Sequence, residues 1–271
     1  MPVIEVNGAN LEYIDKGHGD TVVFVHGSLG DLRTWSRQID SFSKLYRVIA
    51  YSRRYHYPNA KPGASLDYSA NLHAEDLLSL IRGLGLRRAH IVGSSFGAYI
   101  ALILAARNPE LVRSLTLGEP PLIPWLENAQ EGTSLKADFM KKVWEPSKSA
   151  FQRGDLEEGV RTFINGVIGQ ATFDKLPTSV RDAMMDNASE MKAEVLSPGL
   201  FSEFTCDDAM KIVAPTLLLT GEVSPPMFRY IINELHRCMP EAECSVISKS
   251  SHMMQEHPAY NTQVLNFLSR H

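Results

Sequence analysis

The 271-residue sequence predicts an α/β fold in which helices flank a mostly parallel, eight-stranded sheet. Two observations predict this fold. Short apolar runs alternate with longer segments of helical periodicity along most of the chain. The run 21–25 is apolar at nearly every position, which is typical of a central strand covered on both faces. Strands of that kind lie parallel and are joined by right-handed crossovers.

The first part of the chain contains six of the predicted strands. It opens with a hairpin, because residues 3–6 and 11–14 alternate in polarity around a turn at 7–10. The next strands are 21–25, 46–50, a strand ending at 91–92, and 111–117. Helices are expected around 35–42, at 67–84 and at 98–107, and a polar loop is expected at 51–66.

From residue 122 to about residue 210 no strong strand pattern occurs, and the helix-like segments are 134–143, 156–168 and 180–194. Such a block between two strands is most simply a helical cap over the carboxyl edge of the sheet. We therefore expect a core of residues 1–121 and 211–271 and an inserted cap of residues 122–210. The core resumes with strands at 214–220 and 243–247 and helices at 227–238 and 258–268.

Composition and charge restrict the function classes. The chain is 44% hydrophobic and 21% charged, and its formal net charge of -4 offers no basic footprint for nucleic acid or an anionic membrane. No apolar run approaches the roughly 20 residues that span a bilayer. The N-terminal segment lacks the basic and apolar blocks of a signal peptide, so a cytoplasmic protein is expected.

The cysteines are Cys206, Cys238 and Cys244. Their number is odd and their spacing does not fit a zinc site, so we expect buried, reduced thiols and no metal. A Cys238–Cys244 disulfide is the alternative that this spacing leaves open.

One tight turn organises the candidate chemistry. The pentapeptide Gly-Ser-Ser-Phe-Gly at 93–97 lies between the end of a buried strand and the start of a helix. Glycine is needed at both ends because a Cβ there would collide with neighbouring backbone. The turn holds the central side chain, Ser95, in a strained and exposed position. The alternative is a glycine-rich helix start at which the serine is only a cap.

In this strand-turn-helix context the pentapeptide resembles the nucleophile elbow of the α/β-hydrolase superfamily. The order of elements is similar to that family from end to end, apart from the weakly patterned cap. The resemblance implies that Ser95 is a nucleophile and that its general base is a histidine in the loop after the last strand. His252, in the run Ser-Ser-His at 250–252, stands there.

The catalytic acid departs from the common pattern of the family. Most relatives carry Asp in a Gly-x-x-Asp run after the penultimate strand, whereas Ser224 stands at that position here. In a minority of the family the acid follows the strand after the nucleophile helix, where this chain has Glu119. We therefore favour Glu119, whose long side chain can reach the histidine from a neighbouring strand end, and keep Glu222 as the alternative.

The resemblance also implies two backbone donors for the oxyanion. One is the N–H of Phe96, directly after the nucleophile at a helix start. The other is the N–H of Ser28 in the run His-Gly-Ser at 26–28, with the N–H of Leu29 as the alternative. His26 is expected to be structural.

Four side chains are expected to contact substrate: Leu29, Arg53, Trp125 and Met253. Arg53 lies beside Arg54 among aromatic residues, so the pair could meet an anionic or aromatic substrate. The alternative for both arginines is that they form salt bridges that fix their loop.

These residues predict a serine hydrolase that needs no cofactor and cleaves a small or medium carboxylic ester or lactone through an acyl-enzyme. Serine at the elbow argues against epoxide hydrolase and haloalkane dehalogenase chemistry, because those relatives carry Asp there. Hydrolysis of amide, thioester or carbon-carbon bonds stays open. A different class, a ligand receptor or non-hydrolytic biosynthetic cyclase on the same scaffold, is the second hypothesis, because fold does not fix function.

Overall fold

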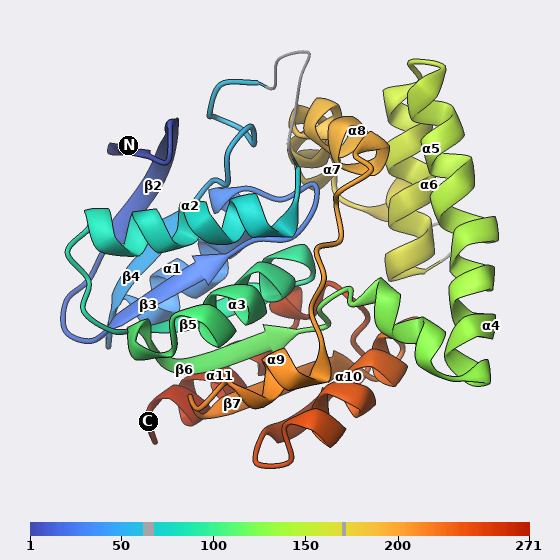
Figure 1. Ribbon diagram of the computed structural model, residues 1–271. Helices are drawn as coiled ribbons and strands as arrows, with labels where there is room; N and C mark the ends of the chain where they lie inside the picture. Colours follow the sequence, from blue (N-terminus) through green and yellow to red (C-terminus); the bar gives the residue numbers. More distant parts are fainter. Residues whose placement is uncertain (62–67, 170–171) are drawn as a thin grey trace.

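The computed structural model describes residues 1–61, 68–169 and 172–271 (Figure 1). Eight strands form one sheet in the order β1-β2-β4-β3-β5-β6-β7-β8. Their bounds are β1 Val3–Val6, β2 Ala9–Lys16, β3 Thr21–Val25, β4 Arg47–Tyr51, β5 Ala89–Ser94, β6 Val112–Gly118, β7 Thr216–Gly221 and β8 Glu243–Ile247. β2 pairs antiparallel with β1 and β4, and all neighbours from β4 to β8 are parallel. The predicted sheet is confirmed.

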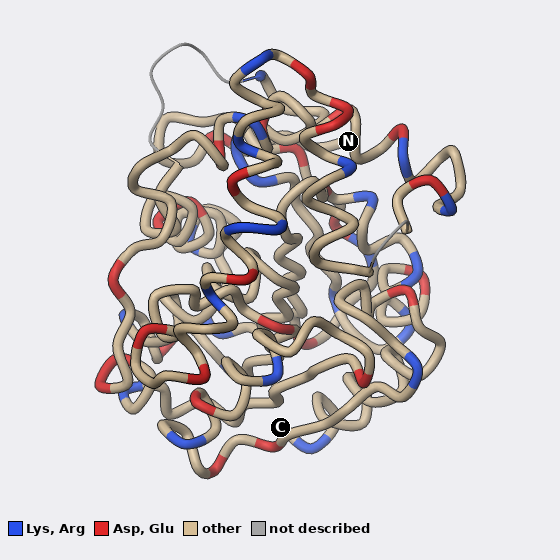
Figure 2. The backbone as a smooth tube through the Cα atoms, turned by 90° about the vertical axis from the view of Figure 1, so that its right-hand side faces the viewer, with Lys and Arg blue, Asp and Glu red and all other residues tan. Residues whose placement is uncertain are grey.

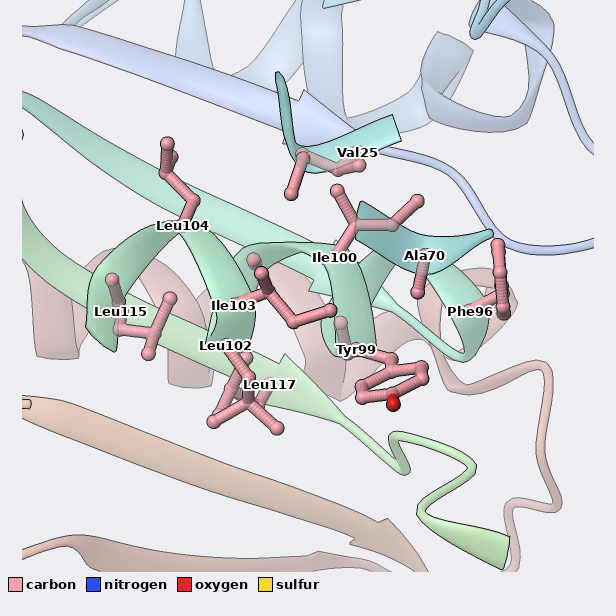
Figure 3. Packing of buried hydrophobic residues seen from close by; sticks show 14 of the residues in the cluster. Val25, Ala70, Phe96, Tyr99, Ile100, Leu102, Ile103, Leu104, Leu115 and Leu117 are labelled. Atoms are coloured by element: carbon pink, nitrogen blue, oxygen red, sulfur yellow. The ribbon is translucent and has the colours of Figure 1, made fainter. Parts of the chain in front are cut away.

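Helices cover both faces of this sheet. One apolar cluster joins it to α2 (Ala70–Gly83), α3 (Phe96–Arg107), α9 (Cys206–Met210) and α10 (Pro226–Cys238). A second cluster joins the opposite face to α1 (Ser36–Phe42) and α11 (Pro258–Leu268). Figure 3 shows Leu102 of α3 close to Leu117 of β6, both fully buried. This packing holds α3, whose first residue follows Ser95, against the sheet.

The start predicted for the second helix, residue 67, and part of the predicted loop, 62–66, lie outside the described residues. The described helix α2 begins at Ala70, and the side chain of Ser69 caps it by accepting from the N–H of Leu72.

Between β6 and β7 the chain forms a block of helices, which lies beyond one end of the sheet in Figure 1. Its helices are α4 Gln130–Phe139, the π-helix η4 Met140–Trp144, α5 Glu145–Gln152, α6 Leu156–Ile168, α7 Thr178–Asp186 and α8 Ala188–Leu196. The helix expected at 180–194 is two helices that meet at Asn187, whose side-chain amide donates to Ala183 O and to Asp31 Oδ2. The division into a core and a cap at residues 121 and 211 stays a prediction.

Short 3-10 turns complete the secondary structure. They are η1 Leu32–Trp35, η2 Pro109–Leu111, η3 Ile123–Asn128, η5 Phe173–Lys175 and η6 Met254–Glu256.

The expectation of three reduced thiols is wrong. Cys206, the first residue of α9, and Cys238, the last residue of α10, form a disulfide with a Cα–Cα distance of 5.5 Å. The two helices pack together and bring these cysteines into contact across 32 positions of the chain, which sequence spacing does not reveal. Cys244 is free and exposed, so the Cys238–Cys244 alternative is wrong as well.

Figure 2 shows Lys and Arg interspersed with Asp and Glu along the chain. No helix in the described part of the chain is both long and apolar enough to cross a membrane. Residues 1–61, 68–169 and 172–271 contain no group of three or more His, Cys, Asp or Glu that could hold a metal ion.

Candidate active site

The turn between β5 and α3 has the strained geometry that its sequence predicts. Ser95 adopts φ 52° and ψ −123°, a conformation that side-chain-bearing residues rarely take. A Cβ at Gly93 would lie 2.6 Å from Ala98 Cα, and a Cβ at Gly97 would lie 2.2 Å from Val25 O on β3. Both positions therefore require glycine. The Ser95 N–H donates to Gly118 O at 2.7 Å, which ties the turn to the end of β6.

His252 follows β8 and lies between a hydroxyl and a carboxylate. Its Nε2 is 2.9 Å from Ser95 Oγ, and its Nδ1 is 2.6 Å from Glu119 Oε2. A carboxylate accepts hydrogen bonds only, so Nδ1 carries the hydrogen and neutral Nε2 can accept from the serine hydroxyl. The imidazole also stacks on Phe228, with ring centroids 4.1 Å apart. Its orientation is therefore fixed from three sides.

Glu119 follows β6 and is fully buried. Its Oε1 accepts from Thr220 Oγ1 at 2.6 Å and from the Gly221 N–H at 2.9 Å, so β7 holds the carboxylate from the other side. Burial raises the pKa of Glu119, but hydrogen bonds from His252 and Thr220 outweigh this and hold the pKa below its usual value. The carboxylate is therefore ionised at neutral pH.

Glu222, the alternative acid, bonds residues other than His252. It is exposed, and its Oε2 accepts from Ser248 Oγ at 2.8 Å and from the Lys249 N–H at 2.7 Å. Ser224, at the position where most relatives carry Asp, is buried and its N–H donates to Gly221 O. Of the two candidate acids, the structure brings Glu119 to the histidine.

The loop after β3 lies against the elbow. A Cβ at Gly27 would be 2.9 Å from Ser95 Cβ, so only glycine permits this approach. The next residue, Ser28, shares a small cavity with Ser95 and Phe96. Phe96 is the first residue of α3, where backbone N–H groups have no acceptor inside the helix. The two residues whose N–H groups are the predicted oxyanion donors therefore line the same cavity as the serine.

His26 and Arg53 hold this loop from behind. His26 is fully buried, and its Nε2 accepts from the Arg53 N–H at 2.9 Å. Arg53 is only 1% exposed, and its Nη2 donates to Gly27 O at 3.2 Å. Arg54 forms an ion pair with Asp76 on α2 at 2.5 Å. For this residue the salt-bridge alternative therefore holds.

A cavity of about 560 Å³ opens onto Ser95 and His252. Leu29 and Met253 line it, together with apolar side chains of α6 and α7. Arg53 and Trp125 line neither of the two cavities that border Ser95; the Trp125 indole instead donates to Phe204 O at 2.6 Å. The structure thus brings two of the four expected substrate contacts to the site.

A second cavity, of about 30 Å³, also borders Ser95, and one of its lining residues was missed by sequence reasoning. Glu194 of α8 lines it and accepts from Ser28 Oγ at 2.5 Å. The available signal was a pair of acids, Glu190 and Glu194, spaced one turn apart beside the apolar positions Met191 and Val195. Only tertiary structure shows that this helix face meets the loop after β3.

The comparisons agree with this architecture. A family model described as alpha/beta hydrolase fold matches residues 20–258. The uncharacterized hydrolase YraK of Bacillus subtilis (strain 168) is 32% identical over 235 residues, which cover 84% of this chain and 80% of YraK.

Solved structures share the fold over nearly the whole chain. The enol-lactonase from Burkholderia xenovorans LB400 superposes with a TM-score of 0.76 at 20% identity, covering 99% of this chain and 100% of that chain. The epoxide hydrolase of Bacillus megaterium superposes with a TM-score of 0.78 at 22% identity. The match covers 99% of this chain and 100% of that chain. The family model, together with the sheet order and the elbow, identifies this chain as a member of the alpha/beta hydrolase fold family.

Proposed function

We propose that this protein is a serine hydrolase that cleaves small or medium carboxylic esters or lactones through an acyl-enzyme on Ser95. One observation carries the proposal: the contacts from Ser95 Oγ to His252 Nε2 at 2.9 Å and from His252 Nδ1 to Glu119 Oε2 at 2.6 Å. A serine hydroxyl is a weak nucleophile until a base within hydrogen-bond reach takes its proton, and this base is oriented by a carboxylate.

In the first half-reaction, Ser95 Oγ attacks the carbonyl carbon while its proton passes to His252 Nε2. The oxyanion forms beside the N–H groups of Ser28 and Phe96, which are held in place before the reaction and need no reorganisation. When the tetrahedral intermediate collapses, the ester C–O bond breaks and His252 gives its proton to the leaving alcohol. Glu119 stabilises the imidazolium that exists between these two proton transfers.

In the second half-reaction, a water molecule takes the place of the alcohol. His252 Nε2 accepts a proton from this water as its oxygen attacks the acyl carbon, and the proton then returns to Ser95 Oγ as the acid is released. With a lactone the leaving alcohol stays attached to the acyl chain, so the product is a single hydroxy acid.

The different volumes of the two cavities favour a substrate with one large group and one small group on either side of the scissile bond. The space of about 560 Å³ has an apolar wall of Phe163, Ile164, Val167, Val180 and Met184, which fits an apolar group of drug-like size. The space of about 30 Å³ admits only a short group. One structural neighbour is named an enol-lactonase, which is consistent with a lactone substrate. Another is named an epoxide hydrolase, which carries out a different reaction.

Stopped-flow hydrolysis of a short-chain 4-nitrophenyl ester tests the proposal. The wild-type protein should release a burst of nitrophenol equal to the enzyme concentration, followed by slower turnover limited by deacylation. Ser95→Ala should lose both phases. Equal turnover in that variant would exclude Ser95 as the nucleophile, whereas no turnover in either protein would favour a receptor or cyclase on the same scaffold.

A further inference from the structure

The small cavity beside Ser95 contains a single ionisable side chain. Its other lining residues are Ser28, Ser95 and apolar or aromatic side chains such as Phe139, Trp144 and Phe228. Glu194 is only 2% exposed. Its Oε1 accepts from Ser28 Oγ, whereas its Oε2 has no hydrogen-bond partner among the described residues. A buried carboxyl oxygen in that state has lost its hydrogen bonds to water and receives none from a protein donor, and the carboxyl beside it is that of Glu190.

The groups that face this carboxyl explain its protonation state. Glu190 lies one turn earlier on α8, and Arg53 and Tyr68 face the pair from outside the helix. His56 Nε2 is 2.7 Å from Glu190 Oε1. Burial, and then the negative charge of Glu190, raise the pKa of Glu194 to about 8. At neutral pH Glu194 is therefore mostly a carboxylic acid, which can donate a hydrogen bond.

Of the charged and titratable residues in this cluster, Glu194 is the one that lines the cavity with Ser95. Glu190 and Arg53 line neither of the two cavities that border Ser95. The Glu190 carboxylate accepts from this acid, so a substrate oxygen that enters the cavity from the serine side competes with Glu190 for the proton of Glu194. A cavity of about 30 Å³ holds about two water-sized groups, so the entering group is a short one.

We propose that Glu194 is a specificity residue that donates a hydrogen bond to an oxygen on a short acyl chain. The substrate class is a carboxylic ester whose acyl group carries an ether, hydroxyl or keto oxygen beyond the reacting carbonyl. The acyl chain lies in the small cavity, and the leaving alcohol lies in the large one. This inference rests on the proposed serine hydrolase function.

A matched pair of substrates isolates this contact. The 4-nitrophenyl esters of methoxyacetic acid and of butyric acid have acyl chains of equal length and differ by one oxygen in place of a methylene. For each protein, the value of kcat/KM for the methoxyacetate is divided by that for the butyrate. Comparing this ratio between wild type and a variant cancels the intrinsic reactivity of each ester and the contribution of the shared triad.

Glu194→Met removes the donor at similar volume and should lower the ratio of methoxyacetate to butyrate roughly three- to ten-fold, the usual effect of one neutral hydrogen bond. Glu194→Gln retains an N–H donor and should keep the preference. The matched control is Glu190→Gln, buried on the same helix but outside the cavity, which should also keep the preference at a pH well below 8.

The pH dependence of the wild-type protein gives a second measurement that needs no variant. The preference for methoxyacetate should fall as pH rises through about 8, because ionised Glu194 cannot donate and repels the ether oxygen. In Glu194→Gln the ratio should be independent of pH.

Three outcomes separate the possibilities. The proposal is supported if the methoxyacetate-to-butyrate ratio of kcat/KM falls in Glu194→Met and is retained in Glu194→Gln. An equal fall for both esters, or a wild-type ratio that does not change with pH, overturns it and leaves Glu194 as a residue that only positions Ser28. If the wild-type protein shows no burst with either ester and Ser95→Ala matches it, the hydrolase function fails first.

Discussion

Glu119 and His252 are 133 positions apart in the chain, yet Glu119 Oε2 lies 2.6 Å from His252 Nδ1. The contact is possible because β6 and β7 are neighbouring parallel strands whose carboxyl ends open at the same edge of the sheet. An acid on β6 can therefore serve a histidine that most relatives reach from the end of β7. The longer Glu side chain spans the additional strand.

Glu119→Gln should lower kcat on the order of 10⁴-fold, because a neutral amide neither fixes the productive tautomer of His252 nor stabilises its imidazolium. Glu222→Gln is the matched control, since this exposed carboxylate bonds Ser248 and the Lys249 backbone instead. Steady-state hydrolysis of a 4-nitrophenyl ester, with circular dichroism to verify folding, measures both. Near wild-type turnover in Glu119→Gln would exclude Glu119 as the acid.

The Cys206–Cys238 disulfide determines how many free thiols the protein should contain. Under denaturing, non-reducing conditions the purified protein should titrate one free thiol, Cys244, rather than three. Cys206→Ser should lower the free energy of unfolding by up to roughly 3–4 kcal/mol, the chain-entropy value for a loop of this length. Three reactive thiols would show that the bond does not form, and Cys244→Ser serves as the control with unchanged stability.

The buried carboxyls of α8 predict that stability decreases as the solution becomes alkaline. Burial raises the pKa of Glu190 to about 7, and burial with the neighbouring charge raises that of Glu194 to about 8, from an unfolded value near 4.5. Between about pH 4.5 and pH 8 the folded state binds more protons than the unfolded state, so the free energy of unfolding falls as pH rises.

Thermal unfolding across that pH window checks this sign. The wild-type midpoint should decrease from pH 5 towards pH 8, and Glu194→Gln should flatten the decrease, because an amide has no proton to lose. The opposite trend, a midpoint that rises over the same window in wild type but not in the variant, would contradict the assigned protonation states.

The sequence predicts the core of the fold because apolar periodicity and glycine punctuation are local signals. The strand at 21–25 and the elbow at 93–97 can be recognised from neighbouring residues alone. The position of Glu119 was also open to prediction, because Ser224 stands where a carboxylate is usual and another strand end supplies one. The catalytic roles of these residues stay predictions.

What the sequence could not predict depends on contacts between distant segments. The Cys206–Cys238 bond requires α9 to pack on α10, and neither helix carries a signal for its partner. Trp125 and Arg53, both expected to contact substrate, donate to backbone carbonyls instead. Glu194 was missed because the helix-like pattern at 180–194 does not show which face meets Ser28.

Mass spectrometry of the protein quenched during turnover of a 4-nitrophenyl ester tests the nucleophile most directly. The wild-type protein should gain the mass of one acyl group, and peptide mapping should assign that group to Ser95, whose Oγ lies 2.9 Å from His252 Nε2. Ser95→Ala should gain none. An acyl group on another residue, or the same labelling in Ser95→Ala, would contradict the acyl-enzyme mechanism.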